Sequence, residues 1–316
     1  GSLRGDQVKT LAFIGLGAMG RPMTENLAKA GFAVQGFDLN GTGTAKSIRE
    51  AVEGAEALIT MLPDGNAVRE AVLEALPHLR KETIVIDMSS ADPAGTRALG
   101  DALKAKDVQM LDAPVSGAVV GARNATLAIM VGGETQVVEK AKPVLSAMGN
   151  QIFHVGPLGA GHAVKALNNY LGAVGTLAGF EVLLVARRFG LDPKPMLDAI
   201  NASTGRNSTT ERKIPRDILP GTFASGFKLA LMAKDVGIAA ELARGLGVDV
   251  PFMKTTLKAW RAAEKALPRG ADHVEIYKWQ EKLSKPRTSG ARRKTAPSRA
   301  AASRRPGSRR KRRRST

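Results

Sequence analysis

Residues 13–23 read FIGLGAMGRPM, and this stretch decides the fold. An apolar, strand-like run ends at the pattern Gly15-x-Gly17-x-x-Gly20, and a helical pattern begins directly behind it. In a dinucleotide-binding turn the first glycine permits the tight turn, the second admits a pyrophosphate, and the third allows close helix–strand packing. We expect the whole turn to contact the ligand, namely Gly15, Leu16, Gly17, Ala18, Met19 and Gly20. The alternative is a glycine-rich turn without a ligand.

An acidic residue, Asp38, ends the next predicted strand, 18 residues after Gly20. A carboxylate at this position accepts hydrogen bonds from the adenosine ribose of NAD and repels the 2′-phosphate of NADP. The residues that follow, Leu39 and Asn40, offer no arginine to receive that phosphate. The sequence therefore favours NAD as the cofactor, with NADP as the alternative.

Short apolar runs alternate with helical patterns through the first half of the chain. Strands that are apolar on both faces and separated by helices imply a doubly wound, Rossmann-type parallel sheet. The strand signals stop after QIFHVGP at residues 151–157, and residues 160–283 have a helical pattern throughout. We therefore expect an NAD(P)-binding domain at 1–154 and an all-helical second domain at 155–283.

The charge is concentrated at one end of the chain. Fourteen of the 47 Lys and Arg residues lie in 284–316, which has no acid, leaving a net charge of +4 on residues 1–283 out of +18. This Arg-, Ser- and Pro-rich segment is predicted to be disordered. Its basic cluster suits nucleic-acid phosphates, so weak DNA or RNA contact through 285–314 is an alternative function. A tail with no function, which only aids solubility, is the other alternative.

Several classes of protein are excluded by composition. The chain has no cysteine, which excludes disulfides and fits a reducing compartment. The first ten residues lack the apolar core of a signal peptide. The longest apolar run, 166–180, is interrupted by two asparagines and falls short of the roughly 20 residues of a membrane span. The four histidines show no metal-ligand spacing, so we expect no metal. The lack of cysteine and of a signal-peptide pattern leads us to expect a cytoplasmic protein.

Three further stretches carry polar groups in patterns that suggest a site. DAPVSGA at 112–118 follows a predicted strand, and backbone N–H groups around its Ser-Gly turn would hold an anion such as a substrate carboxylate. An ordinary strand-end turn is the alternative.

In GPLGAGHAVKALNNY at 156–170, Lys165 and Asn169 project from one helix face. A desolvated lysine there could exchange a proton with a substrate oxygen, whereas a surface lysine is the alternative. Lys234 and Asp235 form a pair in FKLALMAKDVGIA, with a solvated ion pair as the alternative.

Taken together, these four stretches resemble the β-hydroxyacid dehydrogenase family, which includes 3-hydroxyisobutyrate dehydrogenase and tartronate semialdehyde (2-hydroxy-3-oxopropionate) reductase. The resemblance runs from about residue 9 to 283, in order and at the family's spacing. It implies an NAD(P)-dependent interconversion of a short 3-hydroxy acid and its semialdehyde. It also implies a 6-phosphogluconate dehydrogenase-like helical domain through which the chain forms a homodimer or homotetramer.

The resemblance also implies roles for individual residues. Lys165 would be the general acid/base, Asn169 would hold the substrate, and Lys234 would approach both substrate and nicotinamide. The substrate carboxylate would lie on Ser116, Gly117 and Ala118. Further residues of the cofactor cleft would be Met19, Leu62, Pro63, Asn66 and Ser90.

The chain departs from the family pattern in three places. Position 118 is alanine where the family usually has a second glycine. The segment after Asp38 lacks about ten residues that normally form a crossover helix, although a parallel crossover needs about a dozen residues or more. We therefore expect that edge of the sheet to be remodelled. The basic tail has no counterpart in the family's enzymes.

Overall fold

The computed structural model describes residues 8–284, so the predictions made for the basic segment, a disordered tail at 284–316 and a nucleic-acid contact at 285–314, lie outside the described residues apart from Ser284. One sheet contains β1 (Thr10–Ile14), β2 (Ala33–Phe37), β3 (Ala57–Thr60), β4 (Ile84–Asp87), β5 (Gln109–Asp112), β6 (Val115–Ser116), β7 (Leu127–Gly132) and β8 (Gly149–Gly156). Its order is β2-β1-β3-β4-β5-β7-β6, with β8 beside β7. The strands from β2 to β5 are parallel, whereas β7 runs antiparallel to β5 and β6. The chain order reverses between β1 and β3, which is the switch point where a Rossmann sheet binds its ligand.

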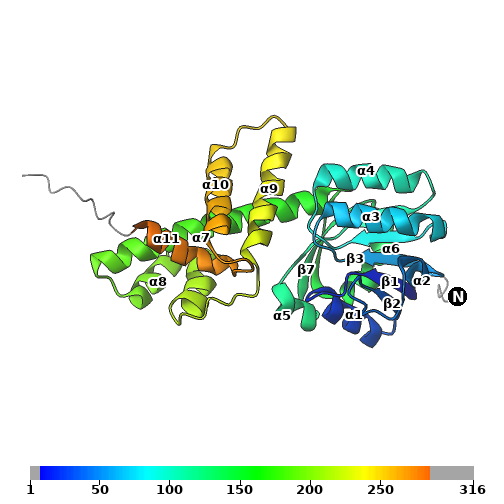
Figure 1. Ribbon diagram of the computed structural model, residues 1–316, viewed down its shortest axis with the longest axis horizontal. Helices are drawn as coiled ribbons and strands as arrows, with labels where there is room; N and C mark the ends of the chain where they lie inside the picture. The colour runs from blue at the N-terminus through cyan, green and yellow to red at the C-terminus, as the bar shows by residue number, and fades with distance from the viewer. Residues whose placement is uncertain (1–7, 285–316) are drawn as a thin grey trace, which may run out of the picture. The chain divides into compact units, whose positions relative to one another are not determined.

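Helices cover both faces of this sheet (Figure 1). They are α1 (Gly20–Lys29), α2 (Ile48–Val52), α3 (Gly65–Ala75), η1 (Leu76–His78), α4 (Pro93–Lys104), α5 (Ala118–Arg123) and α6 (Thr135–Ser146). Apolar side chains of α1, α5 and α6 pack on one face, and those of α2, α3 and α4 pack on the other. Asp64 and Asp92 cap the N-termini of α3 and α4 by accepting backbone N–H groups, as their position before a helical run predicts. The doubly wound architecture is therefore present.

The shortened segment after β2 still completes a parallel crossover. Its helix, α2, has only five residues, yet β2 keeps full parallel pairing with β1. The residues before α2 turn back along the free edge of β2, where the Gly36 N–H donates to Thr44 Oγ1 at 2.9 Å and the Ala45 N–H donates to the Gly36 carbonyl at 3.0 Å. The edge strand is thus covered by its own connection, which is how this edge is remodelled.

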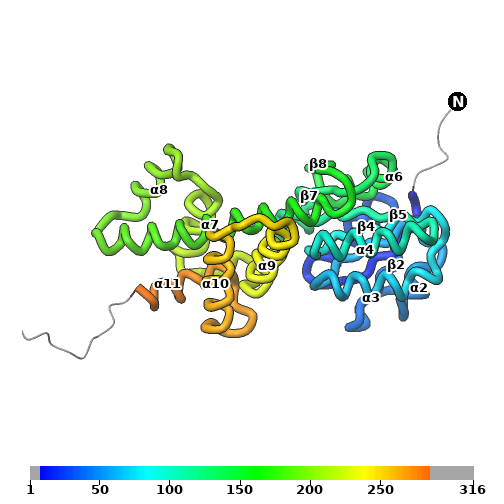
Figure 2. Tube along the Cα trace, turned by 90° about the horizontal axis from the view of Figure 1, so that it is seen from above, coloured from blue at the N-terminus to red at the C-terminus, as the bar shows by residue number. Residues whose placement is uncertain are grey.

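The second half of the described chain is helical. Its elements are α7 (Ala160–Phe189), α8 (Pro193–Asn201), the π-helix η2 (Thr209–Ile218), α9 (Leu229–Gly245), α10 (Pro251–Ala266), η3 (His273–Glu275) and α11 (Ile276–Ser284). Helices α9 and α10 lie beside α7, as Figure 2 shows. A separate core forms around Trp260, Phe180 and Tyr277. Residues 157–284 contain no strand beyond one isolated bridge, between Lys228 and Asp272.

Helix α7 is long and apolar enough to cross a membrane by length and composition alone. One of its faces, however, packs into the helical core through Ala173, Phe180 and Leu183. It also buries the polar side chains of His162 and Lys165. These features are those of a core helix, as its asparagine-interrupted sequence predicts.

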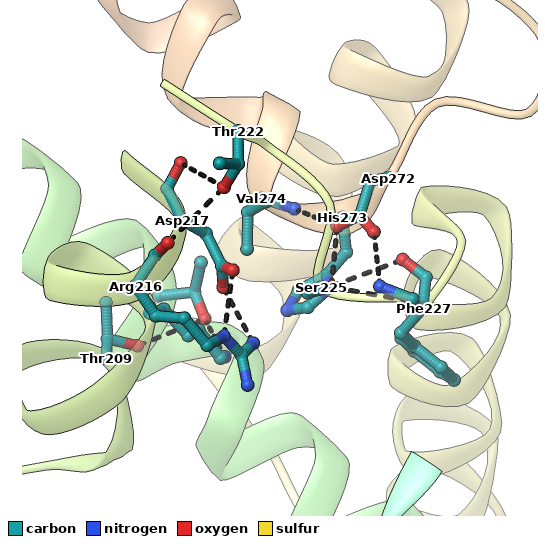
Figure 3. A network of polar contacts seen from close by, with 12 residues as sticks. Thr209, Arg216, Asp217, Thr222, Ser225, Phe227, Asp272, His273 and Val274 are labelled. Carbon is teal, nitrogen blue, oxygen red and sulfur yellow. Dashed lines mark hydrogen bonds and ion pairs between the residues drawn. The ribbon is translucent and has the colours of Figure 1, made fainter. Parts of the chain in front are cut away.

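A polar network fixes the loop that leads into α9 (Figure 3). The Asp272 carboxylate accepts the Ser225 hydroxyl at 2.6 Å and the Gly226 N–H at 2.8 Å, while Ser225 Oγ contacts His273 Nδ1 at 2.8 Å. Burial alone would raise the pKa of Asp272, but the hydrogen bonds from His273, Ser225 and backbone N–H groups lower the pKa to about 2. The ionised carboxylate therefore holds the start of α9 against η3.

The predicted division at residues 154 and 155 stays a prediction. The last strand ends at Gly156 and α7 begins at Ala160, yet the described residues up to Ser284 form one compact unit.

Candidate active site

The glycine turn leaves room for a ligand at one position only. Gly15 has a φ of +99°, and a Cβ there would lie 2.3 Å from the Met61 carbonyl oxygen. A Cβ on Gly20 would lie 1.8 Å from the Gly15 carbonyl oxygen, so both glycines are required by close packing. A Cβ on Gly17, by contrast, would have no described heavy atom within 4 Å. The second glycine therefore faces the open space that a pyrophosphate needs.

The backbone at this turn is also suited to an anion. Among residues 8–284, no acceptor is found for the N–H groups of Gly17, Ala18 and Met19. They lie directly before α1, whose first turn carries no acid. The positive end of the helix dipole and free N–H groups together favour a phosphate. The turn thus fits a dinucleotide, and the alternative of a glycine-rich turn without a ligand explains neither feature.

Asp38 lies against the same turn. One carboxylate oxygen accepts the Leu16 N–H at 2.7 Å, and the other accepts the Asn40 N–H at 3.0 Å. Each oxygen retains a lone pair for a further donor. The carboxylate is therefore fixed beside the glycine turn and free to accept a ribose hydroxyl.

The other residues predicted for the cofactor cleft follow β3 and β4. The Leu62 N–H donates to Ser89 Oγ at 2.9 Å, which ties the two strand ends together. Lys234 Nζ reaches across from α9 and donates to the carbonyl oxygens of Pro63 at 2.8 Å and Ser90 at 3.0 Å. Lys234 lines both a pocket of about 250 Å³, shared with Asn66 and Ser90, and a neighbouring pocket of about 590 Å³.

Lys165 and Asn169 lie on the buried face of α7. Each is only 9% exposed, which contradicts the alternative of a surface lysine. Asn169 Nδ2 donates to Asp235 Oδ2 at 2.6 Å, and Asp235 is 2% exposed, so the alternative of a solvated Lys234–Asp235 pair is wrong as well. Burial lowers the pKa of Lys165; the Asp235 carboxylate opposes this shift and the Lys234 ammonium adds to it.

The Lys165 ammonium group is uncommitted. Within residues 8–284 its Nζ forms no hydrogen bond and no ion pair, although the side chain is desolvated. A buried lysine with a lowered pKa and free N–H donors is suited to proton transfer at a ligand oxygen. No group of three or more His, Cys, Asp or Glu side chains in the described part of the chain could hold a metal ion.

The predicted carboxylate loop has an unusual backbone. Gly117 has a φ of +138°, and Ala118, where α5 begins, has a φ of +54°. A non-glycine residue in this left-handed region costs about 1–2 kcal/mol. In the described chain no hydrogen bond joins Ser116, Gly117 or Ala118 to Lys165 or Lys234. Lys234 Nζ lies 3.7 Å from Asp235 Oδ1, so the predicted residues around Asp235 adjoin those around Lys234.

Comparisons with known proteins agree along the whole described chain. Residues 10–156 match the family described as the NAD binding domain of 6-phosphogluconate dehydrogenase, and residues 159–280 match the NAD-binding family of NADP-dependent 3-hydroxyisobutyrate dehydrogenase. The NAD-dependent L-serine dehydrogenase of Pseudomonas aeruginosa is 37% identical over 80% of this chain and 92% of its own length. The chain belongs to the β-hydroxyacid dehydrogenase family.

Two further relatives show how close the similarity is. The 2-(hydroxymethyl)glutarate dehydrogenase of Eubacterium barkeri is 38% identical over 77% of this chain and 85% of its own length. A solved structure of 3-hydroxyisobutyrate dehydrogenase from Mycobacterium tuberculosis with L-serine has a TM-score of 0.83 and 34% identity, covering 87% of this chain and 99% of that one. As a member of the β-hydroxyacid dehydrogenase family, the protein is a nicotinamide-dependent oxidoreductase of a small molecule.

Sequence reasoning missed four buried polar residues of this dehydrogenase. In the sequence Asp235 stands out only as the neighbour of Lys234, and His162 only as one of four histidines without metal-ligand spacing. Asp87 and Asp112 each end a parallel strand, a position where polar side chains gather at one sheet edge. That position was the signal that could have revealed both aspartates. The four residues are Asp87, Asp112, His162 and Asp235.

Proposed function

We propose that this dehydrogenase interconverts a short 3-hydroxy acid and its semialdehyde, with Lys165 as the general acid/base. The observation that carries the proposal is the uncommitted, buried ammonium of Lys165 beside Asn169 and Asp235. Lowering of its pKa by burial brings the neutral amine within reach at lower pH. A general base of this kind contributes a factor of about 10²–10⁴ to the rate.

The proton chemistry is assigned to Lys165 Nζ. In the oxidation direction the neutral amine accepts the proton of the substrate hydroxyl, and in the reduction direction the ammonium returns it. The nicotinamide, when bound, supplies hydride acceptance or donation at the neighbouring carbon. Asn169, held by Asp235, has one remaining amide N–H with which to orient the substrate oxygen.

The carboxylate of the substrate is assigned to the loop at Ser116, Gly117 and Ala118. Gly117 and Ala118 both have positive φ and lie in the turn where α5 begins, and backbone N–H groups of such turns can bind an anion. Fixing the carboxylate would position the hydroxyl-bearing carbon for reaction, which is the main advantage of a bound over a free reactant.

The names of the relatives point to one substrate class. Serine, 3-hydroxyisobutyrate and 2-(hydroxymethyl)glutarate all carry a hydroxymethyl group on the carbon next to a carboxylate. We take that hydroxymethyl carboxylate as the feature recognised by this chain. NAD is assigned as the cofactor because Asp38 is anchored beside the glycine turn.

A substrate panel tests this function. Purified protein is assayed with L-serine, 3-hydroxyisobutyrate, 2-(hydroxymethyl)glutarate and glycerate, each with NAD and NADP. The matched control is 4-hydroxybutyrate, in which the hydroxyl lies one carbon further from the carboxylate. We expect turnover of at least one hydroxymethyl carboxylate with a higher kcat/KM for NAD. Turnover of the control alone, or of none of these acids, would contradict the substrate class.

A homo-oligomer is proposed through the outer face of α7. Exposed apolar side chains recur along one side of this helix at Val164, Leu167, Leu171, Val182, Val185 and Phe189. A stripe of this length on one helix marks an interaction surface. The mass measured in solution should therefore be that of a dimer or tetramer, and replacing Leu171 by Glu should lower it.

A further inference from the structure

A buried histidine connects the predicted cofactor cleft to the helix that carries Lys165. His162 lies in the first turn of α7, three residues before Lys165, and its ring is fully buried. Neither the glycine turn nor the substrate loop contains it. We propose that His162 is a positioning residue, which holds Lys165 at a fixed place relative to the cofactor cleft. The proposal rests on the proposed function, since it takes Lys165 as the acid/base.

The first turn of α7 is fixed from outside the helix. Asp112, at the end of β5, accepts the Gly159 N–H and the His162 N–H at 2.7 Å each. The carboxylate thereby caps a helix whose own N-cap residue, a glycine, offers no side chain. A Cβ on Gly161 would lie 2.4 Å from the Met130 carbonyl oxygen, so the helix start is pressed against the sheet. The backbone of α7 is therefore rigidly joined to β5 and β7.

The imidazole ring extends this connection to the strand end after β4. His162 Nε2 lies 3.0 Å from the Ser89 carbonyl oxygen, and Nδ1 lies 2.8 Å from Thr96 Oγ1. Because a carbonyl only accepts, Nε2 must carry a proton and donate it to Ser89. The Asp87 carboxylate, 3.5 Å from Nε2, is buried on the same side of the ring.

Ser89 in turn is the residue that organises the cofactor cleft. Its N–H donates to Asp87 Oδ1 at 3.0 Å, and its hydroxyl oxygen accepts the Leu62 N–H. The next carbonyl, that of Ser90, accepts Lys234 Nζ. Asp87 also lines the pocket of about 250 Å³ that contains Ser90 and Lys234. The contact from Nε2–H to the Ser89 carbonyl therefore joins the acid/base helix to the residue that accepts the Leu62 N–H and precedes Ser90.

Isosteric variants separate this contact from the rest of the ring. His162→Gln can place an amide N–H near the position of Nε2 and keep the bond to Ser89. His162→Asn reaches only the position of Nδ1, so it keeps the contact with Thr96 and loses Ser89. His162→Ala loses both. The control is His154→Asn, which removes a contact of 2.9 Å from Nε2 of this exposed histidine on β8 to the Gly133 carbonyl.

We expect kcat to fall about 10- to 100-fold in His162→Asn and His162→Ala, because small misplacements of reacting groups have effects of this size. His162→Gln should recover most of that loss, and the KM of the hydroxy acid should change little in all three. Thermal midpoints should be similar in His162→Gln and His162→Asn. The control should keep wild-type kcat. NADH binding, followed by its fluorescence, shows whether cofactor affinity falls together with kcat.

The outcomes distinguish positioning from a merely structural role. If His162→Gln is no better than His162→Asn, or if kcat follows the thermal midpoint across the three variants, the inference is wrong. Near-wild-type kcat in His162→Ala would also overturn it. The proposed function fails separately, because it predicts loss of turnover in Lys165→Met whatever the His162 series shows.

Discussion

Two lysines of the helical half, Lys165 and Lys213, are both desolvated, yet their surroundings differ. Burial lowers the pKa of Lys165, and burial together with Arg212 and Arg216 lowers the pKa of Lys213 to about 8. Lys213 Nζ donates to Thr176 Oγ1 at 2.6 Å, whereas Lys165 Nζ has no hydrogen-bond partner within residues 8–284. A lowered pKa alone therefore does not mark a catalytic lysine.

The carboxylates near the two lysines also differ in the partners that they bind. Asp235 faces Lys165 and holds Asn169, a side chain with a donor to spare. Asp217, near Lys213, is occupied by a bidentate contact with Arg216 at 2.7 and 2.8 Å. The donors and acceptors around Lys213 are thus paired with one another, while Lys165 has donors without a partner among residues 8–284. This difference leads to three predictions.

The largest effect is expected from removing each ammonium in turn. Lys165→Met should lower kcat by a factor of about 10²–10⁴, because the general acid/base is lost. Lys213→Met, the matched change at a lysine already committed to Thr176, should leave kcat close to the wild-type value. Steady-state kinetics with the best acid of the panel gives both numbers, and NADH binding should survive in both variants. Equal losses of kcat in the two variants would show that Lys165 has no catalytic role that Lys213 lacks.

The second prediction concerns the effect of Lys213 on the free energy of unfolding. The pKa of Lys213 falls from an ordinary 10.5 to about 8 on folding, so the folded state binds fewer protons between these values. The free energy of unfolding of the wild type should therefore rise with pH through that window. Below about pH 8 this pKa shift destabilises the folded state by about 3 kcal/mol, and the hydrogen bond from Lys213 to Thr176 offsets about 1 kcal/mol of that loss.

Lys213→Met should accordingly be more stable than the wild type by about 2 kcal/mol at neutral pH. The difference should shrink as pH rises above about 8. Urea unfolding at several pH values measures it. A constant difference across the window would mean that Lys213 is not desolvated in the folded protein.

The fold follows from local signals, and the parts of the site that do not are long-range. The strand–glycine–helix pattern at Gly15 to Gly20 and the strand end at Asp38 predict the Rossmann-type sheet and the cofactor turn. The antiparallel direction of β7 has no local signal, because a short apolar run does not record which way its neighbour points. The covering of β2 by Thr44 and Ala45 likewise depends on a side chain meeting a distant backbone group.

The same limit applies to the site itself. Lys165 and Asn169 are one turn apart on one helix, so their proximity follows from helical spacing. His162, Asp87 and Asp112 come together from three elements, and only the three-dimensional arrangement shows that they form one buried group. Asp235 was visible as a neighbour of Lys234, but adjacent residues on a helix point in different directions, and burial decides which of the two is inside.

The smallest effect is expected from the charge opposite Lys165. Burial lowers the pKa of Lys165 and Asp235 opposes this shift, so Asp235→Asn should lower that pKa further. Oxidation needs the neutral amine, so its rate should rise with pH and reach half-maximum at a lower pH in the variant. Reduction needs the ammonium, so its rate should decline at a lower pH as well. The amide oxygen that Asp235→Asn introduces can still accept the N–H of Asn169 Nδ2, which keeps the contact proposed to orient the substrate.

Asp217→Asn is the matched control beside Lys213, and it should leave both pH profiles of kcat/KM in place. A profile that does not move in Asp235→Asn, or moves to higher pH, would show that another group titrates.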